Sequence, residues 1–364
     1  MKRLWPMVLL ATTLCGCDLL VPEAQESRPP GYPRSYSRII AAAEKEGEVT
    51  VYSATEMNKI KPVLDDFNQL FPKIRVRYVL IHTLDLNSQI VAEGDAHRGV
   101  ADIAWSSAMG QQIKLVNDGY AQAYASPERH ALPDWALWKN EAYGITAEPI
   151  VFAYNRRFMP KADIPTTHAA FTKLLEDKRA AYTNMVATYN PMLSGVGYLL
   201  FTQDMQATPD TEHLIRAMAA TRAQLYESTQ SMVPALASGK QILAYNVISS
   251  YVLEQAQADD SIGIVVPQDY TLLMSRIAFI PAAAPHPNAA RLFLDYLLSR
   301  RGQSHLAKLD MNPVRTDMAQ GTLLASASGE TRGIRLGPAL LVDLDALKGR
   351  HFARQWNDAF AHSH

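Results

Sequence analysis

The sequence predicts an α/β fold arranged as two lobes, because strand-like and helix-like segments alternate along a chain long enough to form both. The chain has 364 residues, of which 48% are hydrophobic and 20% are charged, a composition typical of a globular protein. Strands separated by helices favour βα units and mainly parallel sheets. In such sheets ligands bind beyond the carboxyl ends of the strands, where loops turn into helices.

The first residues predict export from the cytoplasm. A basic start at residues 1–3 precedes an apolar run over residues 4–14, which has the length of a signal-peptide core and is too short to span a bilayer. The run ends in the letters LCGC, which are similar to a bacterial lipobox, so we predict a lipoprotein signal peptide over residues 1–17 with Cys17 acylated. This predicts a lipid-anchored protein on the periplasmic side of the inner membrane. A plain secretory signal is the alternative.

Residues 18–37 predict a disordered tether, because four prolines with Glu, Ser and Gln between them cannot build a core. Cys15 and Cys17 are the only cysteines, so the exported body would hold no disulfide and no cysteine-rich metal site. Lys and Arg total 35 against 36 for Asp and Glu, so no global field is present that would gather nucleic acid.

The first part of the body predicts three strands and two helices. Residues 49–52 are β-prone, and the apolar residues between 57 and 71 follow a 3,4,3,4 spacing that marks one face of a helix. Residues 74–80 alternate in polarity as a half-buried strand does. A helix over residues 86–93 and a strand over residues 101–105 complete this part.

A second α/β segment begins after Pro149. We predict a strand over residues 150–154, a helix over 171–175, and a turn-rich loop over 190–197 that leads into an apolar helix. The chain then returns through strands at 262–267 and 272–280. An amphipathic helix over residues 289–298 follows.

No motif supports catalysis. The chain has no GxxxxGK[ST], GxSxG or HExxH pattern, and its ten histidines lack metal-ligand spacing. What recurs is a hydroxyl-rich turn where a strand gives way to a helix, at residues 53–55, 106–107, 194–197 and 228–231. Helix N-termini that converge on one cleft would bind an anion. The alternative is that each Ser or Thr only caps its helix.

Arg276 lies in the apolar run 272–280, so it needs a partner if it is buried. That partner is either a ligand carboxylate or phosphate, held bidentately, or an internal Asp or Glu. The aromatic residues Tyr52, Trp105, Tyr245 and Tyr251 are candidates for the walls of a cleft, with core packing as the alternative.

The chain resembles the bacterial extracellular solute-binding proteins of ATP-driven importers, in particular the branch that binds ferric iron. The matching motifs, in order, are FPKIRV at 71–76, ADIAWSSA at 101–108, AYNRR at 153–157, SGKQILAYNVISSY at 238–251 and HPNAARLFLDYLLSRRGQSHLAK at 286–308. The resemblance implies a type II periplasmic binding protein fold with a hinge and a ligand cleft between two lobes. It implies crossovers near residues 148–154 and 263–268. Lobe 1 would comprise 38–148 plus 267–364, and lobe 2 would comprise 149–266.

Ferric members of this branch hold the metal with a histidine, a glutamate and two adjacent tyrosines. The motifs place Glu56 at the histidine position, Ser107 at the glutamate position, and Ser249 and Ser250 at the tyrosine pair. Neutral hydroxyls do not replace the anionic oxygens that Fe(III) needs. We therefore predict an anionic solute, phosphorylated or carboxylated. Ferric iron bound by Tyr245, Tyr251 and Glu56 is the alternative.

The resemblance thus implies a monomeric binding component without catalysis or cofactor, which delivers its solute to a membrane permease and its ATPase. The alternative output is a report to a sensor kinase. The predicted ligand contacts are Ser53, Thr55, Glu56, Ser106, Ser107, Ser194, Gly195, Tyr245, Ser249, Ser250 and Arg276.

Overall fold

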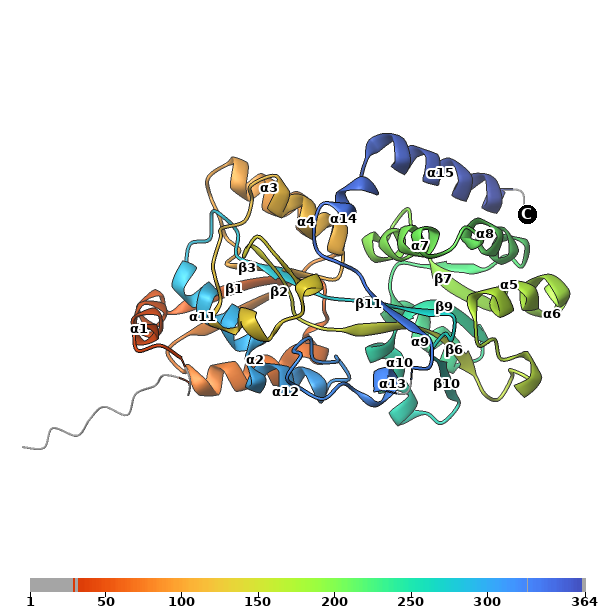
Figure 1. The fold of residues 1–364 in the computed structure, drawn as a ribbon, viewed down its shortest axis with the longest axis horizontal. Helices are drawn as coiled ribbons and strands as arrows, with labels where there is room; N and C mark the ends of the chain where they lie inside the picture. The colour runs from red at the N-terminus through yellow and green to blue at the C-terminus, as the bar shows by residue number, and fades with distance from the viewer. Residues whose placement is uncertain (1–28, 30–31, 326, 362–364) are drawn as a thin grey trace, which may run out of the picture.

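The computed structural model describes residues 29, 32–325 and 327–361. Within these residues the chain forms two mixed β-sheets, each flanked by helices, which lie side by side as two lobes (Figure 1). Cys17, the predicted signal peptide and most of the predicted tether lie outside the described residues.

The first sheet has the strand order β2-β1-β3-β12-β5-β4. Its strands are β1 (Glu48–Ser53), β2 (Arg75–Leu80), β3 (Ile103–Ser106), β4 (Leu137–Trp138), β5 (Ala142–Gly144) and β12 (Ile277–Phe279). The strands β2, β1 and β3 are parallel, whereas β12 is antiparallel to β3. We call the half of the molecule built on this sheet lobe 1.

The second sheet has the order β13-β11-β6-β9-β7-β8, with β10 also paired to β6. Its strands are β6 (Glu148–Asn155), β7 (Val186–Tyr189), β8 (Gln224–Tyr226), β9 (Leu243–Ile248), β10 (Ile262–Val265), β11 (Tyr270–Met274) and β13 (Glu330–Gly333). We call the half of the molecule built on this sheet lobe 2.

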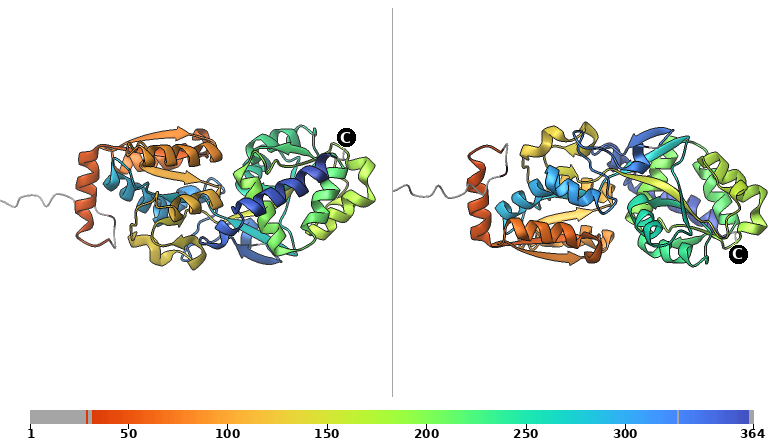
Figure 2. Two further views of the ribbon diagram at one scale, coloured as in Figure 1. Left: turned by 90° about the horizontal axis from the view of Figure 1, so that it is seen from above. Right: turned by 90° about the horizontal axis from the view of Figure 1, so that it is seen from below.

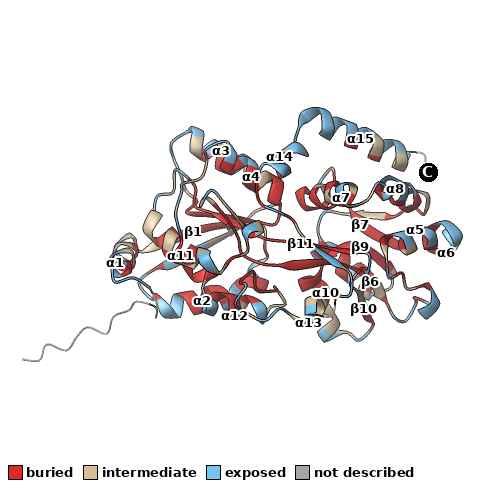
Figure 3. Ribbon diagram, in the orientation of Figure 1, coloured by how far each residue is buried: buried red, intermediate tan, exposed pale blue. Residues whose placement is uncertain are grey.

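The helices cover the faces of these sheets (Figure 2). The α-helices are α1 (Tyr36–Glu46), α2 (Met57–Leu70), α3 (Thr83–Asp95), α4 (Met109–Asn117), α5 (His168–Asp177), α6 (Arg179–Tyr182), α7 (Gly195–Ala207), α8 (Thr211–Ala220), α9 (Thr229–Ala237), α10 (Ser249–Ala258), α11 (Pro287–Leu298), α12 (Arg300–Ala307), α13 (Thr322–Ala325), α14 (Ala339–Val342) and α15 (Ala346–Ala361). Short 3-10 turns occupy Pro127–Ala131, Asp134–Ala136 and Lys161–Asp163. The central strands are buried and the outer helix faces are exposed (Figure 3).

The predicted element types agree with the structure, with boundaries that differ by a few residues. The apolar spacing after residue 57 forms α2, whose Ile60, Leu64 and Phe67 are buried. The main difference is the run 272–280, which forms two strands in different sheets rather than one. Its break lies at Ser275 and Arg276, between β11 and β12.

Up to β12 the chain crosses between the two sheets at two neighbouring places, and it returns to the second sheet between α12 and β13. It passes from β5 to β6 over residues 145–147, and from β11 back to β12 over residues 275–276. The second crossing therefore lies near residue 275 rather than at the expected 263–268. The segment at 262–265 is instead β10, which pairs with β6 inside lobe 2.

The C-terminal part also differs from the expected lobe boundary, which assigned residues 267–364 to lobe 1. The strand β13 pairs with β11 in lobe 2. The helix α15 contacts α8, and its Trp356 packs against Phe201 with ring centroids 4.9 Å apart. The apolar face of α15 is buried on lobe 2 because Phe352 and Trp356 are both less than 5% exposed.

The helix α1 joins the far end of lobe 1 by packing on α11. The carboxylate of Asp295 on α11 accepts hydrogen bonds from Tyr36 Oη (2.7 Å), Tyr124 Oη (2.5 Å) and Ser126 Oγ (2.6 Å). Burial raises the pKa of Asp295 to about 6, although these hydroxyl groups act in the opposite direction. This carboxyl group therefore couples the packing of α1 to pH.

We expect the free energy of unfolding to fall as pH rises through the window between about 4 and 6. The folded chain keeps the Asp295 proton there, whereas an unfolded aspartate, with a pKa of about 3.9, has lost it. The shift corresponds to about 3 kcal/mol, lost once pH exceeds about 6. Urea denaturation at stepped pH measures this slope. The Asp295→Asn variant, which cannot titrate, should lose it, and equal slopes in both proteins would contradict the assignment.

Candidate functional site

A cleft with a volume of ≈ 710 Å³ lies between the two lobes. Its lining from lobe 1 comes from the loops that lead into α2, α3 and α4, and its lining from lobe 2 comes from the starts of α7, α9 and α10. The lining residues are Ala54, Glu56, Leu80, Ile81, His82, Thr83, Leu84, Asp85, Ser107, Tyr189, Leu193, Ser194, Val196, Leu225, Tyr226, Glu227, Ser228, Thr229, Ser231, Ile248 and Tyr251. The cleft therefore lies where strands give way to helices in both sheets.

Two helix N-termini form the hydroxyl-rich wall of lobe 2. Ser194 caps α7 by accepting from the Gly197 N–H (3.2 Å). Ser228 caps α9 by accepting from the Ser231 N–H (3.1 Å), and Ser231 closes a capping box in return. The first turn of each helix keeps N–H groups without an intrahelical partner, and the helix dipole adds partial positive charge. This wall can hold an oxyanion.

Side chains of both lobes meet at the base of the cleft. Tyr251 on α10 donates to Glu56 Oε2 at the start of α2 (2.8 Å). Lys59 on α2 donates to Glu254 (2.6 Å) and to the Ser250 carbonyl (3.1 Å), both on α10. These contacts hold α2 of lobe 1 against α10 of lobe 2.

Arg276 lies behind this contact, in the crossing at residues 275–276. Its Nε and Nη2 donate to Glu148 (2.8 and 3.2 Å), and its Nη1 donates to Thr55 Oγ1 (2.7 Å). Glu148 also accepts from Ser250 Oγ (2.6 Å) and from Thr146 Oγ1 (2.9 Å). Arg276 and its hydrogen bonds hold the pKa of the Glu148 carboxyl below its usual range despite complete burial. Of the two partners considered for Arg276, the structure shows the internal carboxylate.

Three of the predicted contact residues line the cleft: Glu56, Ser107 and Ser194. Four others lie behind it, where their polar groups serve the protein itself. Ser53 Oγ accepts from the Thr55 N–H and Ser106 Oγ from the Ala108 N–H. Thr55 and Ser250 belong to the network around Arg276 and Glu148.

Tyr245, Ser249 and Gly195 are also absent from the lining. The Tyr245 hydroxyl donates to buried Asp204 inside lobe 2 (2.8 Å). Ser249 is fully buried at the start of α10. The lobes approach each other closely at Gly195, since a Cβ there would lie 3.1 Å from Ala108 Cβ in lobe 1. Its lack of a side chain permits the contact between α7 and α4.

Sequence reasoning missed most of the remaining lining. Tyr189 ends β7, and its hydroxyl pairs with Thr229 Oγ1 (2.7 Å). The hydroxyl-rich turn at residues 228–231 is the sequence signal for Ser228 and Ser231. No pattern marked the residues 80–85 or Leu193, because their position depends on how the two lobes face each other.

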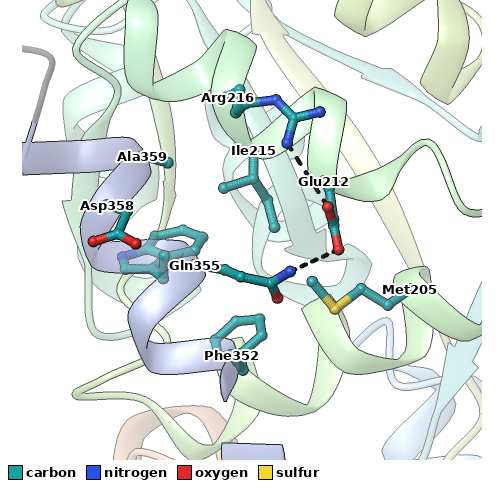
Figure 4. A pocket seen from close by; sticks show the side chains of 9 residues that line it. Met205, Glu212, Ile215, Arg216, Phe352, Gln355, Asp358 and Ala359 are labelled. Atoms are coloured by element: carbon teal, nitrogen blue, oxygen red, sulfur yellow. Dashed lines mark hydrogen bonds and ion pairs between the residues drawn. The ribbon is translucent and has the colours of Figure 1, made fainter. Parts of the chain in front are cut away.

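A second cavity of ≈ 310 Å³ lies between α8 and α15, within lobe 2 (Figure 4). Ile215 and Met205 face Phe352 across it, and Gln355 donates to Glu212 (2.8 Å). This cavity marks an imperfect fit of α15 on lobe 2. Within the described residues no group of three or more His, Cys, Asp or Glu side chains is placed to hold a metal ion.

Comparison with known families identifies what this architecture is. Residues 63–329 match the model of the family described as bacterial extracellular solute-binding protein. The chain belongs to this family. The substrate binding protein of an ABC transporter from Agrobacterium tumefaciens is 34% identical, with a TM-score of 0.81 over 86% of this chain and 94% of that chain. No curated protein sequence matches the chain.

More distant solute-binding proteins share the fold. Iron-bound HitA from Pseudomonas aeruginosa is 17% identical with a TM-score of 0.68, and AfuA from Actinobacillus pleuropneumoniae, with fructose-6-phosphate bound, is 17% identical with a TM-score of 0.70. Each match covers 86% of this chain and 99% of the other. The type II periplasmic binding protein fold is therefore confirmed.

Membership of this family also identifies the general role of the chain. It is the solute-binding component of an ABC importer, a binding protein rather than an enzyme, with a small-molecule ligand and a membrane permease as its partners. The family works outside the cytoplasm. None of the helices in residues 32–325 and 327–361 is long and apolar enough to cross a membrane.

Proposed function

We propose that the chain captures a small organic solute through a phosphate, phosphonate or carboxylate group and delivers it to the permease from a lipid anchor at Cys17. The observation that carries the ligand class is the convergence of α7 and α9, with their capping serines Ser194 and Ser228, on one interlobe cleft. Free N–H groups and hydroxyls at helix starts bind anionic oxygens. The solute bound by AfuA, fructose-6-phosphate, belongs to this class.

Ferric iron is the second candidate, because HitA binds iron and Tyr251 and Glu56 both line the cleft. The details disfavour it. Burial raises the pKa of Tyr251, so the phenolate that Fe(III) requires is costly to form. The hydroxyl groups of Tyr189 and Tyr251 are also engaged, with Thr229 and Glu56. An organic oxyanion needs no such deprotonation.

The test is thermal unfolding of the unlipidated chain from residue 18, with and without a panel of sugar phosphates, alkyl phosphonates, dicarboxylates and ferric citrate. A ligand that binds only the folded state raises the midpoint. We expect a rise with an organic oxyanion that is smaller in Ser194→Gly and Ser228→Gly. Glycine keeps most of the capping stability while removing the hydroxyl.

Ser299→Gly is the matched control, because Ser299 caps α12 in lobe 1 in the same way, outside the cleft. It should keep the full rise. A hydrogen bond to a charged group contributes about 1.5–3 kcal/mol, so each cleft variant should weaken binding by about 10-fold to 100-fold. If ferric salt alone raises the unfolding midpoint, and the rise is unchanged in both serine variants, the result would favour ferric iron as the ligand.

A further inference from the structure

The charged side chains of the cleft are mainly acidic, which an anion-only ligand does not explain. Glu56 and Asp85 line the wall of lobe 1, and Glu227 lies at the edge of lobe 2. Among the described residues that line the cleft there is no lysine or arginine. His82 is the one histidine in this lining.

The two cations that lie against Tyr251 of the cleft lining are already neutralised. Arg276 is paired with Glu148, and Lys59 is paired with Glu254 at 2.6 Å. Both cations lie against the ring of Tyr251, at 5.5 and 4.7 Å from its centroid, and both are almost fully buried. Their charges cannot balance Glu56, so the lobe 1 wall keeps a net negative charge.

Glu56 itself is held in place with one oxygen free. Its Oε2 accepts from Tyr251 Oη, whereas its Oε1 has no hydrogen-bond partner within the described residues. Glu56 precedes α2 but makes no capping hydrogen bond with its side chain. The Oε1 atom of Glu56 can therefore accept a hydrogen bond from a donor group on the ligand.

The rest of the lining suits a short hydrocarbon linker. The hydroxyls of Tyr189, Tyr226 and Tyr251 bond to Thr229, Gln241 and Glu56, so these residues offer the cleft mainly their rings. Leu80, Leu84 and Leu193 line the cleft although they are 57%, 41% and 55% exposed. Aromatic rings also attract organic cations.

We propose that the ligand has two charged ends: an ammonium group bound by Glu56 in lobe 1, and the oxyanion bound by the starts of α7 and α9 in lobe 2. The inference rests on the proposed function and names its substrate class, an amino-substituted phosphate, phosphonate or carboxylate. Such a ligand bridges the lobes because each end matches one lobe only. Closure is then selected by molecules that carry both ends, since only they gain contacts on both sides.

Isothermal titration of the unlipidated chain with matched compounds tests this. The pairs are phosphoethanolamine with ethyl phosphate, and 4-aminobutyrate with butyrate, which differ by the amine alone. Butylamine and choline supply the amine without the oxyanion. We expect the amino member of at least one pair to bind about 10-fold to 100-fold more tightly than its partner.

Glu56→Gln should remove this preference, because it keeps an acceptor for Tyr251 and loses the charge. Asp65→Asn is the matched control: Asp65 is an exposed carboxylate on α2 that pairs with Lys61, outside the cleft lining. It should keep the preference. Thermal unfolding without ligand checks that both variants are folded.

The outcomes separate this inference from the proposed function. Binding of ethyl phosphate or butyrate, with no pair in which the amino member binds more tightly, would overturn the two-ended ligand and leave the oxyanion site standing. Binding of butylamine or choline as tightly as the amino acids or amino phosphates would overturn the oxyanion site and leave the ammonium site. Binding of no compound in either pair would count against both.

Discussion

Replacing Arg276 with leucine is expected to lower the free energy of unfolding by about 3–5 kcal/mol. The guanidinium makes two hydrogen bonds to Glu148 and one to Thr55. The variant leaves the Glu148 carboxylate unpaired while it is 0% exposed, and burying an uncompensated charge is costly. Urea denaturation measures the change.

Arg75→Leu is the matched control, because Arg75 pairs with Glu48 at the surface with its side chain 76% exposed. An exposed ion pair contributes about 1 kcal/mol or less. The double variant Arg276→Leu with Glu148→Leu should recover much of the loss, since it removes both charges. A change below about 1 kcal/mol in Arg276→Leu would show that water reaches Glu148 and that the pair is not buried.

The Arg276–Glu148 pair also affects how the two lobes are connected. Glu148 begins β6 and Arg276 precedes β12, so the pair connects two of the segments that link the lobes. Thr55 belongs to lobe 1 and Ser250 to lobe 2, and both bond to the pair. Loosening of the hinge in Arg276→Leu should therefore accompany the loss of stability.

The case of Arg276 shows what the sequence could and could not predict. An arginine in an apolar run must have a partner if it is buried, and that much followed from the residues. The identity of the partner did not follow, because Glu148 is 128 residues away along the chain. The pairing of β11 with β6 and of β12 with β5 brings the two together.

The fold was predicted well where periodicity carries the information. The 3,4,3,4 spacing specified α2, and alternation specified β2. The C-terminal residues were assigned to the wrong lobe. The sequence of an amphipathic helix such as α15 indicates an apolar face, but it does not indicate which lobe covers that face. The same limit applies to β13, which pairs with β11 in lobe 2.

The site was predicted at the level of turns rather than side chains. Hydroxyls after strands were recognised correctly as lying near the cleft, and Ser107 and Ser194 line it. Ser53 and Ser106 follow the same pattern but bond to the backbone two residues on. Which of two adjacent polar residues faces a ligand depends on the local backbone direction, which composition does not encode.

The second large effect is expected for Trp356→Ala in α15, which lies beyond the residues matched by the family model. Trp356 is 2% exposed and packs between the rings of Phe201 and Phe360, at 4.9 and 4.6 Å. Truncation of a buried tryptophan costs about 3–5 kcal/mol because the lost contacts leave a cavity. Here the new space would join the cavity of Figure 4.

Leu347→Ala is the control on the same helix, because Leu347 is 69% exposed and should change the free energy of unfolding by about 0.5 kcal/mol or less. Hydrogen exchange over residues 346–361 should report early loss of protection in Trp356→Ala, as expected if α15 detaches before the lobes unfold. If protection and stability both match those of the parent chain, the Trp356 side chain does not stabilise the packing of α15 on lobe 2.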